Sequence, residues 1–315
     1  MPNDKRYLVT GSTGFIGACL VHKLVEMDCT VHVVIRKESN TWRINDIMEN
    51  INVHIADLTN LTEINTVVKN IHPDVVYHLA AYGAYHFQID TTKMIQTNIV
   101  GTMNLLNVCS NYGFEAFINI GSSSEYGSKN KKIKEIYLLE PDSHYGVTKS
   151  CATLFCQCEA KNKKLPINNV RLFSVYGYFE ERTRLIPTII KACLCGQNPK
   201  LLSPDSVRDF IFVDDVIDFL LKLSANPKIS GEIFNVGSGL QRTVGDVVNE
   251  TIKLTKSSIQ PIWGSADLRP TKEPKIWVAD ISKAKKMLDW EPKNSLKQGL
   301  KKSIKWYEKN IKYYE

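Results

Sequence analysis

Short apolar runs alternate with amphipathic stretches along the first half of the chain. Apolar runs of strand length predict strands over residues 6–10, 30–36, 52–56, 74–79, 116–120 and 167–173. Apolar positions at helical spacing predict helices around residues 20–25 and over 59–70, 94–112 and 145–161, the second of them with Thr59 as its N-cap. Strands that alternate with helices in this way predict a parallel sheet covered by helices on both faces.

The second half has a different rhythm, because prolines punctuate shorter elements after Phe173. We therefore predict an α/β protein with a Rossmann-type, doubly wound parallel sheet over residues 1–176. A smaller, mainly substrate-binding domain is predicted over 177–315, and 209–237 return to the first domain. Two domains suit a chain of 315 residues, whose 43% hydrophobic and 23% charged content is typical of soluble globular proteins.

Several classes of protein are disfavoured by what the chain lacks. No apolar run approaches the roughly 18 residues of a membrane span, and the first residues show no signal-peptide pattern, so we expect a cytoplasmic protein. The eight cysteines include no C-x-x-C pair, which argues against a metal site and favours reduced thiols packed in the core.

The net charge of +7 comes partly from lysines that follow Lys283. They alternate with apolar residues at helical spacing, which predicts the solvent face of a terminal amphipathic helix. No nucleic-acid-binding motif accompanies the charge, so we expect no nucleic-acid partner. A basic surface also suits small anionic ligands such as sugar nucleotides.

A glycine-rich turn, Gly11-Ser12-Thr13-Gly14-Phe15-Ile16-Gly17, follows the first strand and precedes the first helix. Strand, glycine-rich turn and helix form the context of a dinucleotide-binding motif, in which the helix N-terminus holds the pyrophosphate. The spacing is G-x-x-G-x-x-G instead of the commoner G-x-G-x-x-G, and a plain strand-to-helix turn is the alternative.

The second strand ends in Arg36-Lys37, where NAD-binding domains usually carry an acidic residue for the ribose 2′-hydroxyl. Two cations at this position favour a 2′-phosphate and therefore NADP. In the alternative reading Arg36 only covers the adenine, and Glu38 or Asp57 binds the ribose of NAD.

A proton-transfer group is predicted between Gly121 and Lys149. Tyr145 lies four residues before Lys149 in a helical pattern, which places the phenol and the ammonium on one helix face. Ser122, in the run Ser122-Ser123-Ser124-Glu125, could point a hydroxyl at the same place.

Taken together, these motifs resemble the extended short-chain dehydrogenase/reductases, and more closely the NAD(P)-dependent nucleotide-sugar epimerase/dehydratase family. The resemblance covers nearly the whole chain. It includes the glycine turn, His78-Leu79-Ala80-Ala81, Asn98-Ile99-Val100-Gly101-Thr102, Arg171 to Gly177, Arg208-Asp209-Phe210, Asn235-Val236-Gly237 and Arg269-Pro270. The segment 35–44 also looks like its counterpart in NADP-dependent GDP-mannose 4,6-dehydratases, which supports the NADP prediction.

The resemblance implies roles for individual residues. The pyrophosphate would be held by Gly11, Thr13, Gly14, Phe15, Ile16 and Gly17, the adenine by Asp57 and Leu58, and the nicotinamide side by Leu79, Ala80, Ala81 and Phe173. Arg208 and Arg269 would grip the substrate's phosphates. Ser174 stands where many relatives carry asparagine, and Tyr82 either lines the sugar pocket or packs a loop. Relatives form homodimers through the helices corresponding to 94–112 and 145–161.

The chemistry follows from these roles. Tyr145 would be the acid/base at the sugar hydroxyl that becomes a ketone, and Lys149 would hold the nicotinamide ribose and lower the pKa of Tyr145. Ser122 would donate a hydrogen bond to the reacting oxygen.

Two registers remain open for Glu125, because the dehydratase signature is one residue short in this chain. In the first, Ser123 and Ser124 fill the acid/base positions and Glu125 lies outside them, which favours a 4-epimerase or 4-ketoreductase. In the second, Ser124 and Glu125 regain the roles of a 4,6-dehydratase. A cofactor-binding regulator without activity is the non-enzyme alternative, which the presence of Ser122, Tyr145 and Lys149 disfavours.

Overall fold

The computed structural model describes residues 4–264 and 274–314, and these divide into two compact units. The first unit comprises residues 4–127, 135–172 and 217–235, and the second comprises 128–134, 173–216, 236–264 and 274–314. The chain therefore leaves the first unit after β6 (Ile167–Leu172) and returns to it within α7 (Val213–Ser224).

A seven-stranded sheet forms the centre of the first unit, in the order β11-β6-β5-β4-β1-β2-β3. Its strands are β1 (Arg6–Thr10), β2 (Thr30–Ile35), β3 (Asn52–Ile55), β4 (Val75–His78), β5 (Ala116–Ser122), β6 (Ile167–Leu172) and β11 (Ile233–Val236). Every neighbouring pair from β3 to β6 is parallel. The predicted Rossmann-type α/β fold is confirmed, and its strand order reverses between β1 and β4, where such sheets bind ligands.

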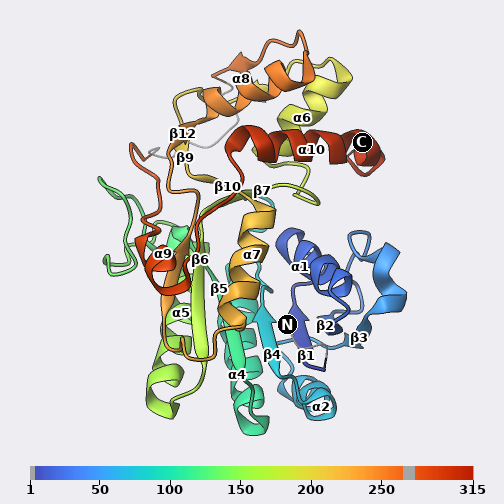
Figure 1. Ribbon diagram of the computed structural model, residues 1–315, viewed down its shortest axis with the longest axis vertical. Helices are drawn as coiled ribbons and strands as arrows, with labels where there is room; N and C mark the ends of the chain where they lie inside the picture. The colour runs from blue at the N-terminus through green and yellow to red at the C-terminus, as the bar shows by residue number, and fades with distance from the viewer. Residues whose placement is uncertain (1–3, 265–273, 315) are drawn as a thin grey trace. The chain divides into compact units, whose positions relative to one another are not determined.

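Helices cover both faces of this sheet (Figure 1). They are α1 (Phe15–Glu26), α2 (Leu61–Ile71), α3 (Thr91–Ile95), α4 (Gly101–Tyr112), α5 (His144–Lys163) and α7. Figure 1 shows α2, α4 and α5 on one face and α1 and α7 on the other. Successive residues of β4 point to opposite faces of the sheet. Tyr77 is hydrogen-bonded to Ser224 of α7, whereas His78 is hydrogen-bonded to Thr102 of α4.

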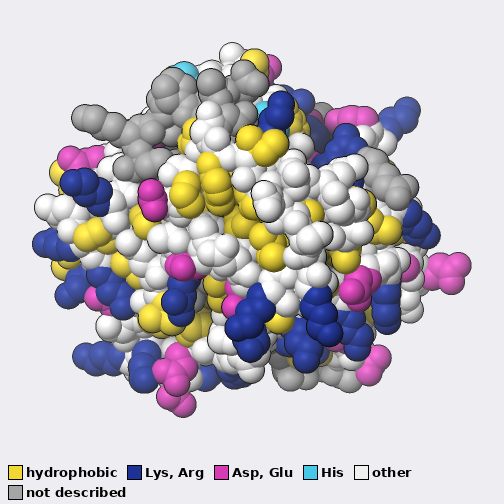
Figure 2. Space-filling model, turned by 90° about the horizontal axis from the view of Figure 1, so that it is seen from above, with side chains coloured by type: hydrophobic (Ala, Val, Ile, Leu, Met, Phe, Trp, Pro, Cys, Tyr) yellow, Lys and Arg dark blue, Asp and Glu magenta, His cyan; other side chains and the backbone are white. Residues whose placement is uncertain are grey.

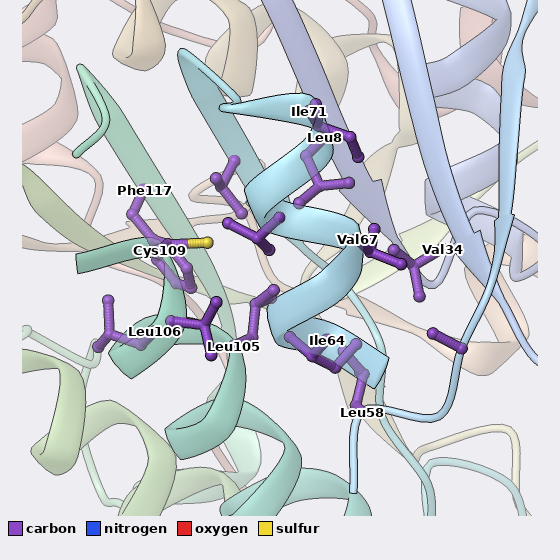
Figure 3. Packing of buried hydrophobic residues seen from close by; sticks show 14 of the residues in the cluster. Leu8, Val34, Leu58, Ile64, Val67, Ile71, Leu105, Leu106, Cys109 and Phe117 are labelled. Carbon is purple, nitrogen blue, oxygen red and sulfur yellow. The ribbon is translucent and has the colours of Figure 1, made fainter. Parts of the chain in front are cut away.

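The core on the α2 and α4 face is almost purely aliphatic (Figure 3). Ile64, Val67 and Ile71 of α2 lie at helical spacing in this cluster. Figure 3 shows Val67 beside Val34 of β2, with Leu105 and Leu106 of α4 on the other side of α2. Leu8, Val76 and Phe117 contribute from β1, β4 and β5, where they are neighbours in register and point to the same face of the sheet. Because these side chains are fully or almost fully buried, each stabilises the fold by about 1.5–3 kcal/mol relative to exposure.

The start of α2 differs from the prediction. Asn60 is the N-cap, and its side-chain oxygen accepts hydrogen bonds from the backbone N–H groups of Thr62 and Glu63. Thr59 instead donates its hydroxyl and its N–H to the Asp57 carboxylate. The prediction failed because two adjacent residues are both good N-caps, and only the tertiary turn decides between them.

The long helix predicted over 94–112 is interrupted. Residues Gln96–Val100 form one turn of π-helix (η2) between α3 and α4. Such turns are rare and often occur at functional sites. This turn carries Asn98, which is fully buried although it is polar.

The second unit is built from smaller elements. They are β7 (Ser174–Tyr176), α6 (Leu185–Cys195), β8 (Lys200–Leu201), β9 (Val207–Arg208), β10 (Phe210–Phe212), β12 (Arg242–Thr243), α8 (Val244–Thr255), β13 (Ile262–Trp263), α9 (Ser282–Leu288) and α10 (Leu296–Asn310). Its strands pair two by two, β7 with β10, β9 with β12 and β8 with β13. An aromatic cluster lies at its centre, with Tyr176 packed against Phe210 and Phe212.

The terminal helix α10 has the predicted amphipathic character. Leu300, Ile304 and Tyr307 are buried, whereas Lys301 and Lys305 are exposed. Figure 2 shows Lys and Arg side chains spread over the face in view, with Asp and Glu side chains among them. No helix in the described residues is both long enough and apolar enough to span a membrane.

None of the eight cysteines forms a disulfide in the described structure, but the prediction that they pack in the core holds only in part. Cys19, Cys29, Cys109, Cys156 and Cys193 are buried. Cys151, Cys158 and Cys195 are exposed, since they lie on the outer faces of α5 and α6. Within residues 4–264 and 274–314, no three His, Cys, Asp or Glu side chains are arranged to hold a metal ion.

A histidine pair near the edge of the sheet makes stability depend on pH. His32 Nδ1 lies 3.0 Å from His54 Nε2, and burial, His54 and Arg6 lower the pKa of His32 from 6.5 to about 4. The folded state thus favours neutral His32, and the unfolded chain binds more protons between these values. We expect the free energy of unfolding to fall by about 1–3 kcal/mol as the pH drops from 6.5 to 4.

Urea unfolding at several pH values in this window measures the effect. The comparison is with a His32→Asn variant, in which the decrease should be clearly smaller because the buried imidazole is absent. A difference between the two proteins that stays constant from pH 6.5 to 4 would contradict the assignment.

Candidate active site

The glycine turn has the shape of a phosphate cradle. A Cβ on Gly17 would lie 2.1 Å from the Gly11 carbonyl oxygen, so only glycine allows this close approach of helix to turn. No side chain caps the N-terminus of α1 at Gly14, which leaves its first N–H groups to a ligand. Ser12 Oγ is buried and has no hydrogen-bond partner among the described residues. An uncapped helix end and an unpaired hydroxyl in one turn fit a bound pyrophosphate.

The predicted cations at the end of β2 have different surroundings. Arg36 pairs with Glu38 (Nε to Oε1, 3.3 Å), which offsets part of its charge. Arg43 lies with its guanidinium 4.6 Å from the centre of the Trp42 ring and donates to the Thr13 carbonyl at 3.3 Å. Arg43 therefore places a cation directly on the glycine turn.

The residues predicted for the adenine and nicotinamide sides lie at the carboxyl ends of β3 and β4. The Asp57 carboxylate accepts a hydrogen bond from the Thr59 hydroxyl within the same turn, and Leu58 is buried against α4. Leu79 donates its N–H to the Thr10 carbonyl, and the Ala80 N–H points at the Thr10 hydroxyl (3.4 Å). Ala81 follows directly, so these turns border the same end of the sheet as the glycine turn.

Helix α5 contains both Tyr145 and Lys149. Ser143 caps its N-terminus by accepting from the Gly146 N–H, which sets Tyr145 in the first turn. Tyr145 is half-buried, whereas Lys149 is 2% exposed. Burial lowers the pKa of Lys149, and the negative charge of Glu125 opposes this shift. A four-residue separation in a continuous helix puts the two side chains on one face, as predicted.

Ser122 and Glu125 belong to one buried network. Ser122 Oγ accepts from the Ser124 N–H, and Glu125 Oε1 accepts from the Ser122 N–H at 2.8 Å. The other Glu125 oxygen pairs with Arg171 Nε at 2.7 Å, and Thr153 of α5 donates to Oε1 at 3.1 Å. Glu125 is 0% exposed, and its burial raises the pKa of the carboxyl while Arg171 opposes the rise.

Gly121 makes this network possible. A Cβ at this position would lie 2.5 Å from Glu125 Oε1, so any other residue would displace the carboxylate. Ser123 is 6% exposed, and Ser124 is half-buried. The two residues between Ser122 and the buried Glu125 in the sequence are thus both serines, whose side chains carry only hydroxyls.

The remaining predicted residues belong to the second unit. Phe173 is 5% exposed and packs against Trp277, while Ser174 begins β7. Arg208 ends β9, where it lies opposite Arg242 of β12 in antiparallel register. Like charges in this position repel, which suits a site for an anion. Arg269 lies outside the described residues.

Sequence reasoning gave no role to Asn98. Its side-chain amide accepts from the Tyr82 N–H, donates to the Tyr82 carbonyl, and donates to Thr148 Oγ1, each at 2.8–2.9 Å. It thus ties the turn after β4 to the first turns of α5. Two signals in the sequence pointed to it: its place in the family motif Asn98 to Thr102, and a polar residue at an inward position of an apolar helix pattern.

Comparisons with known proteins agree with this geometry. A model of the NAD dependent epimerase/dehydratase family matches residues 7–237. UDP-glucuronate 4-epimerase from Thermodesulfobacterium geofontis is 29% identical over 330 residues, covering 97% of each chain. dTDP-glucose 4,6-dehydratase from Haemophilus influenzae is 28% identical, covering 95% of this chain and 97% of the relative.

Solved structures give the same result. UDP-glucuronic acid 4-epimerase from Bacillus cereus, in complex with UDP-glucuronic acid and NAD, is 29% identical with a TM-score of 0.85. The match covers 97% of this chain and 99% of that one. Since the family match spans most of the chain and the fold agrees along its length, the protein is an enzyme of the NAD dependent epimerase/dehydratase family.

Proposed function

We propose that the protein is a 4-epimerase of a nucleotide-activated sugar, which works through a 4-keto species. The observation that carries the proposal is the burial of Glu125. A 4,6-dehydratase needs a carboxylate that reaches C5 of the sugar, and Glu125 is instead held by Arg171, Thr153 and the Ser122 N–H. Ser123 and Ser124, which remain near the site, are poor proton acceptors at neutral pH. The 4-ketoreductase is the runner-up.

We propose for Tyr145, Ser122 and Lys149 the roles that the family resemblance implies, and the placement of Tyr145 and Lys149 in one helix supports them. Tyr145 takes the proton of the C4 hydroxyl as it becomes a ketone and returns it to the same oxygen when the ketone is reduced. Ser122 Oγ donates a hydrogen bond to the same oxygen. Lys149 supplies a positive charge that favours the phenolate of Tyr145. A nicotinamide cofactor held at the glycine turn would supply the hydride chemistry, and return of the hydride to the opposite face of the ketone would invert C4.

The second unit, with Arg208 and Ser174, would bind the nucleotide diphosphate, and the first unit would bind the cofactor. The UDP-sugars of the relatives make a UDP-sugar the first candidate substrate.

Product analysis after incubation with UDP-, dTDP-, GDP- and CDP-sugars tests the reaction. We expect a product of unchanged mass and altered C4 configuration, without net consumption of cofactor. A Glu125→Gln variant should give the same type of product. Loss of water that disappears in Glu125→Gln would establish a dehydratase, and oxidation of the reduced cofactor with a gain of two hydrogens would establish a reductase.

We further propose that NADP is the preferred form of the NAD(P) cofactor, although the Bacillus cereus relative contains NAD. Arg43 on the glycine turn, with Arg36 nearby, supports this choice. Replacing Arg43 by alanine should weaken NADP binding about tenfold or more and leave NAD binding within about twofold, since only the 2′-phosphate is lost as a partner.

Isothermal titration with both cofactors measures the ratio, and Arg36→Ala should lower it less because Glu38 already offsets its charge. Lys23→Ala, on the outer face of α1, is the matched control for loss of a positive charge. An unchanged NADP/NAD ratio in both arginine variants would contradict the proposal.

A homodimer in the cytoplasm completes the proposal. Helix α5 exposes Val147 and Leu154, at 45% and 54%, and Ile95 of α3 is 42% exposed. Exposed apolar side chains on neighbouring helices are typical of an interface, and free thiols suit a reducing compartment. Sedimentation velocity should give twice the 35.7 kDa mass of one chain, and a stable monomer would contradict the dimer.

A further inference from the structure

A continuous chain of hydrogen bonds runs under the proposed active site, and His78 is its central link. His78 is 0% exposed at the end of β4. Its Nδ1 lies 2.7 Å from Thr10 Oγ1 of β1, and its Nε2 lies 2.8 Å from Thr102 Oγ1 of α4. Both ring nitrogens of a fully buried histidine are therefore satisfied by hydroxyls from two different elements.

The direction of each bond can be assigned from its ends. Thr102 donates its hydroxyl proton to the Asn98 carbonyl at 2.7 Å, so it can only accept from His78 Nε2. His78 is neutral, because burial and the charge of Lys149 lower its pKa to about 3. Its Nδ1 therefore carries no proton and accepts from Thr10, whose oxygen faces the Ala80 N–H at 3.4 Å.

The two ends of this chain of hydrogen bonds lie at groups that the proposed reaction uses. At one end Ala80 belongs to the turn predicted for the nicotinamide side. At the other end Asn98 belongs to the π-turn, and its side chain holds Tyr82 and Thr148. Thr148 lies in α5 between Tyr145 and Lys149 and donates to the Tyr145 carbonyl at 2.9 Å.

We propose that His78 is a positioning residue that fixes the nicotinamide-side turn, through Thr10 and Ala80, relative to the π-turn and the Tyr145 helix, through Thr102 and Asn98. It acts as a neutral imidazole with the proton on Nε2, and it touches neither cofactor nor substrate. Nδ1 binds the hydroxyl that leads to the nicotinamide-side turn, and Nε2 binds the hydroxyl that leads to the π-turn. A substitution that keeps only one of these hydrogen bonds should therefore affect cofactor affinity and kcat differently. The kinetic part rests on the proposed function, whereas the tautomer and the cofactor affinity do not.

Two substitutions of His78 should each keep one of the two hydrogen bonds that its ring makes. Asparagine places an acceptor near the position of Nδ1, and glutamine places an N–H donor near that of Nε2. His78→Asn should keep the dissociation constant of NAD(P)⁺ within about twofold and lower kcat about tenfold. His78→Gln should raise that dissociation constant about fivefold, with a smaller loss of kcat.

Thr102→Val and Thr10→Val serve as second variants, should a substitution at His78 itself prevent folding. Thr102→Val should behave like His78→Asn, and Thr10→Val like His78→Gln. If all four variants lower thermal stability but change cofactor affinity and kcat in parallel, His78 is only a structural core residue and the proposal is wrong.

The tautomer is tested without any turnover. Nitrogen-15 spectra of histidine-labelled protein, with His78 assigned by its loss in His78→Gln, should show a neutral ring protonated on Nε2 from pH 8 down to pH 5. A proton on Nδ1, or an imidazolium at neutral pH, would overturn the proposal. Failure of the wild-type protein to convert any nucleotide sugar would count against the proposed function alone, because the tautomer and affinity results would still decide this inference.

Discussion

Replacement of Tyr145 by phenylalanine should lower the turnover of nucleotide sugars by about 10²–10⁴-fold, the usual cost of removing a positioned general acid/base. We propose that the half-buried phenol in the first turn of α5 exchanges a proton with the sugar hydroxyl. Lys149 cannot replace it, because this residue is only 2% exposed and lies one helical turn further along α5. The measurement is kcat with the nucleotide sugar that the product analysis identifies.

Cofactor affinity and thermal stability should stay close to those of the wild-type protein, since only one hydroxyl is removed from a half-buried ring. Tyr112→Phe is the matched control, because it deletes a hydroxyl that donates to Asn65 at the far end of α4. A Tyr145→Phe enzyme that retains turnover within about threefold of wild type would exclude the assigned role.

Replacement of Arg171 by methionine should destabilise the protein by about 3–5 kcal/mol, because it leaves a buried carboxylate without its partner. The side chains of Arg171 and Glu125 are 2% and 0% exposed, and they meet at 2.7 Å. Arg171 also lies 4.5 Å from the centre of the Tyr126 ring and donates to its hydroxyl. Urea unfolding measures the change in free energy, relative to a total of roughly 5–15 kcal/mol for an ordinary domain.

Two comparisons distinguish the stability lost through the unpaired carboxylate charge from the stability lost through poorer side-chain packing. The double variant Glu125→Gln/Arg171→Met should be more stable than Arg171→Met, since it no longer buries an unpaired carboxylate. Arg6→Met removes an arginine from the partly exposed pair with Asp74 and should cost only about 1 kcal/mol. Equal losses for Arg171→Met and Arg6→Met would show that burial does not strengthen the first pair.

The features predicted correctly from the sequence are those that depend on residues close together in the chain. The glycine turn and the Tyr145–Lys149 spacing each lie within one turn or helix, so local periodicity was enough to place them. The parallel sheet followed from the alternation of apolar runs with helices, because each crossover needs a helix between its strands.

The surroundings of Glu125 could not be predicted in this way. Its partner Arg171 is 46 residues away, and only the pairing of β5 with β6 brings them together. The sequence therefore left two registers open, whereas in the structure Arg171, Thr153 and the Ser122 N–H hold the carboxylate. His78 and Asn98 were part of the family motifs but received no role for the same reason, since their partners lie on other strands and helices.

The return of the chain to the first unit has a consequence for biosynthesis. The seventh strand, β11, completes the sheet beside β6, and Asn235 accepts the hydroxyl proton of Tyr126 next to the Glu125–Arg171 pair. A ribosome must therefore release residues 173–235 before β6 has a neighbour on that side. Until then the nascent sheet has an open edge that can pair with other chains, so folding of the catalytic unit begins early but finishes late in synthesis.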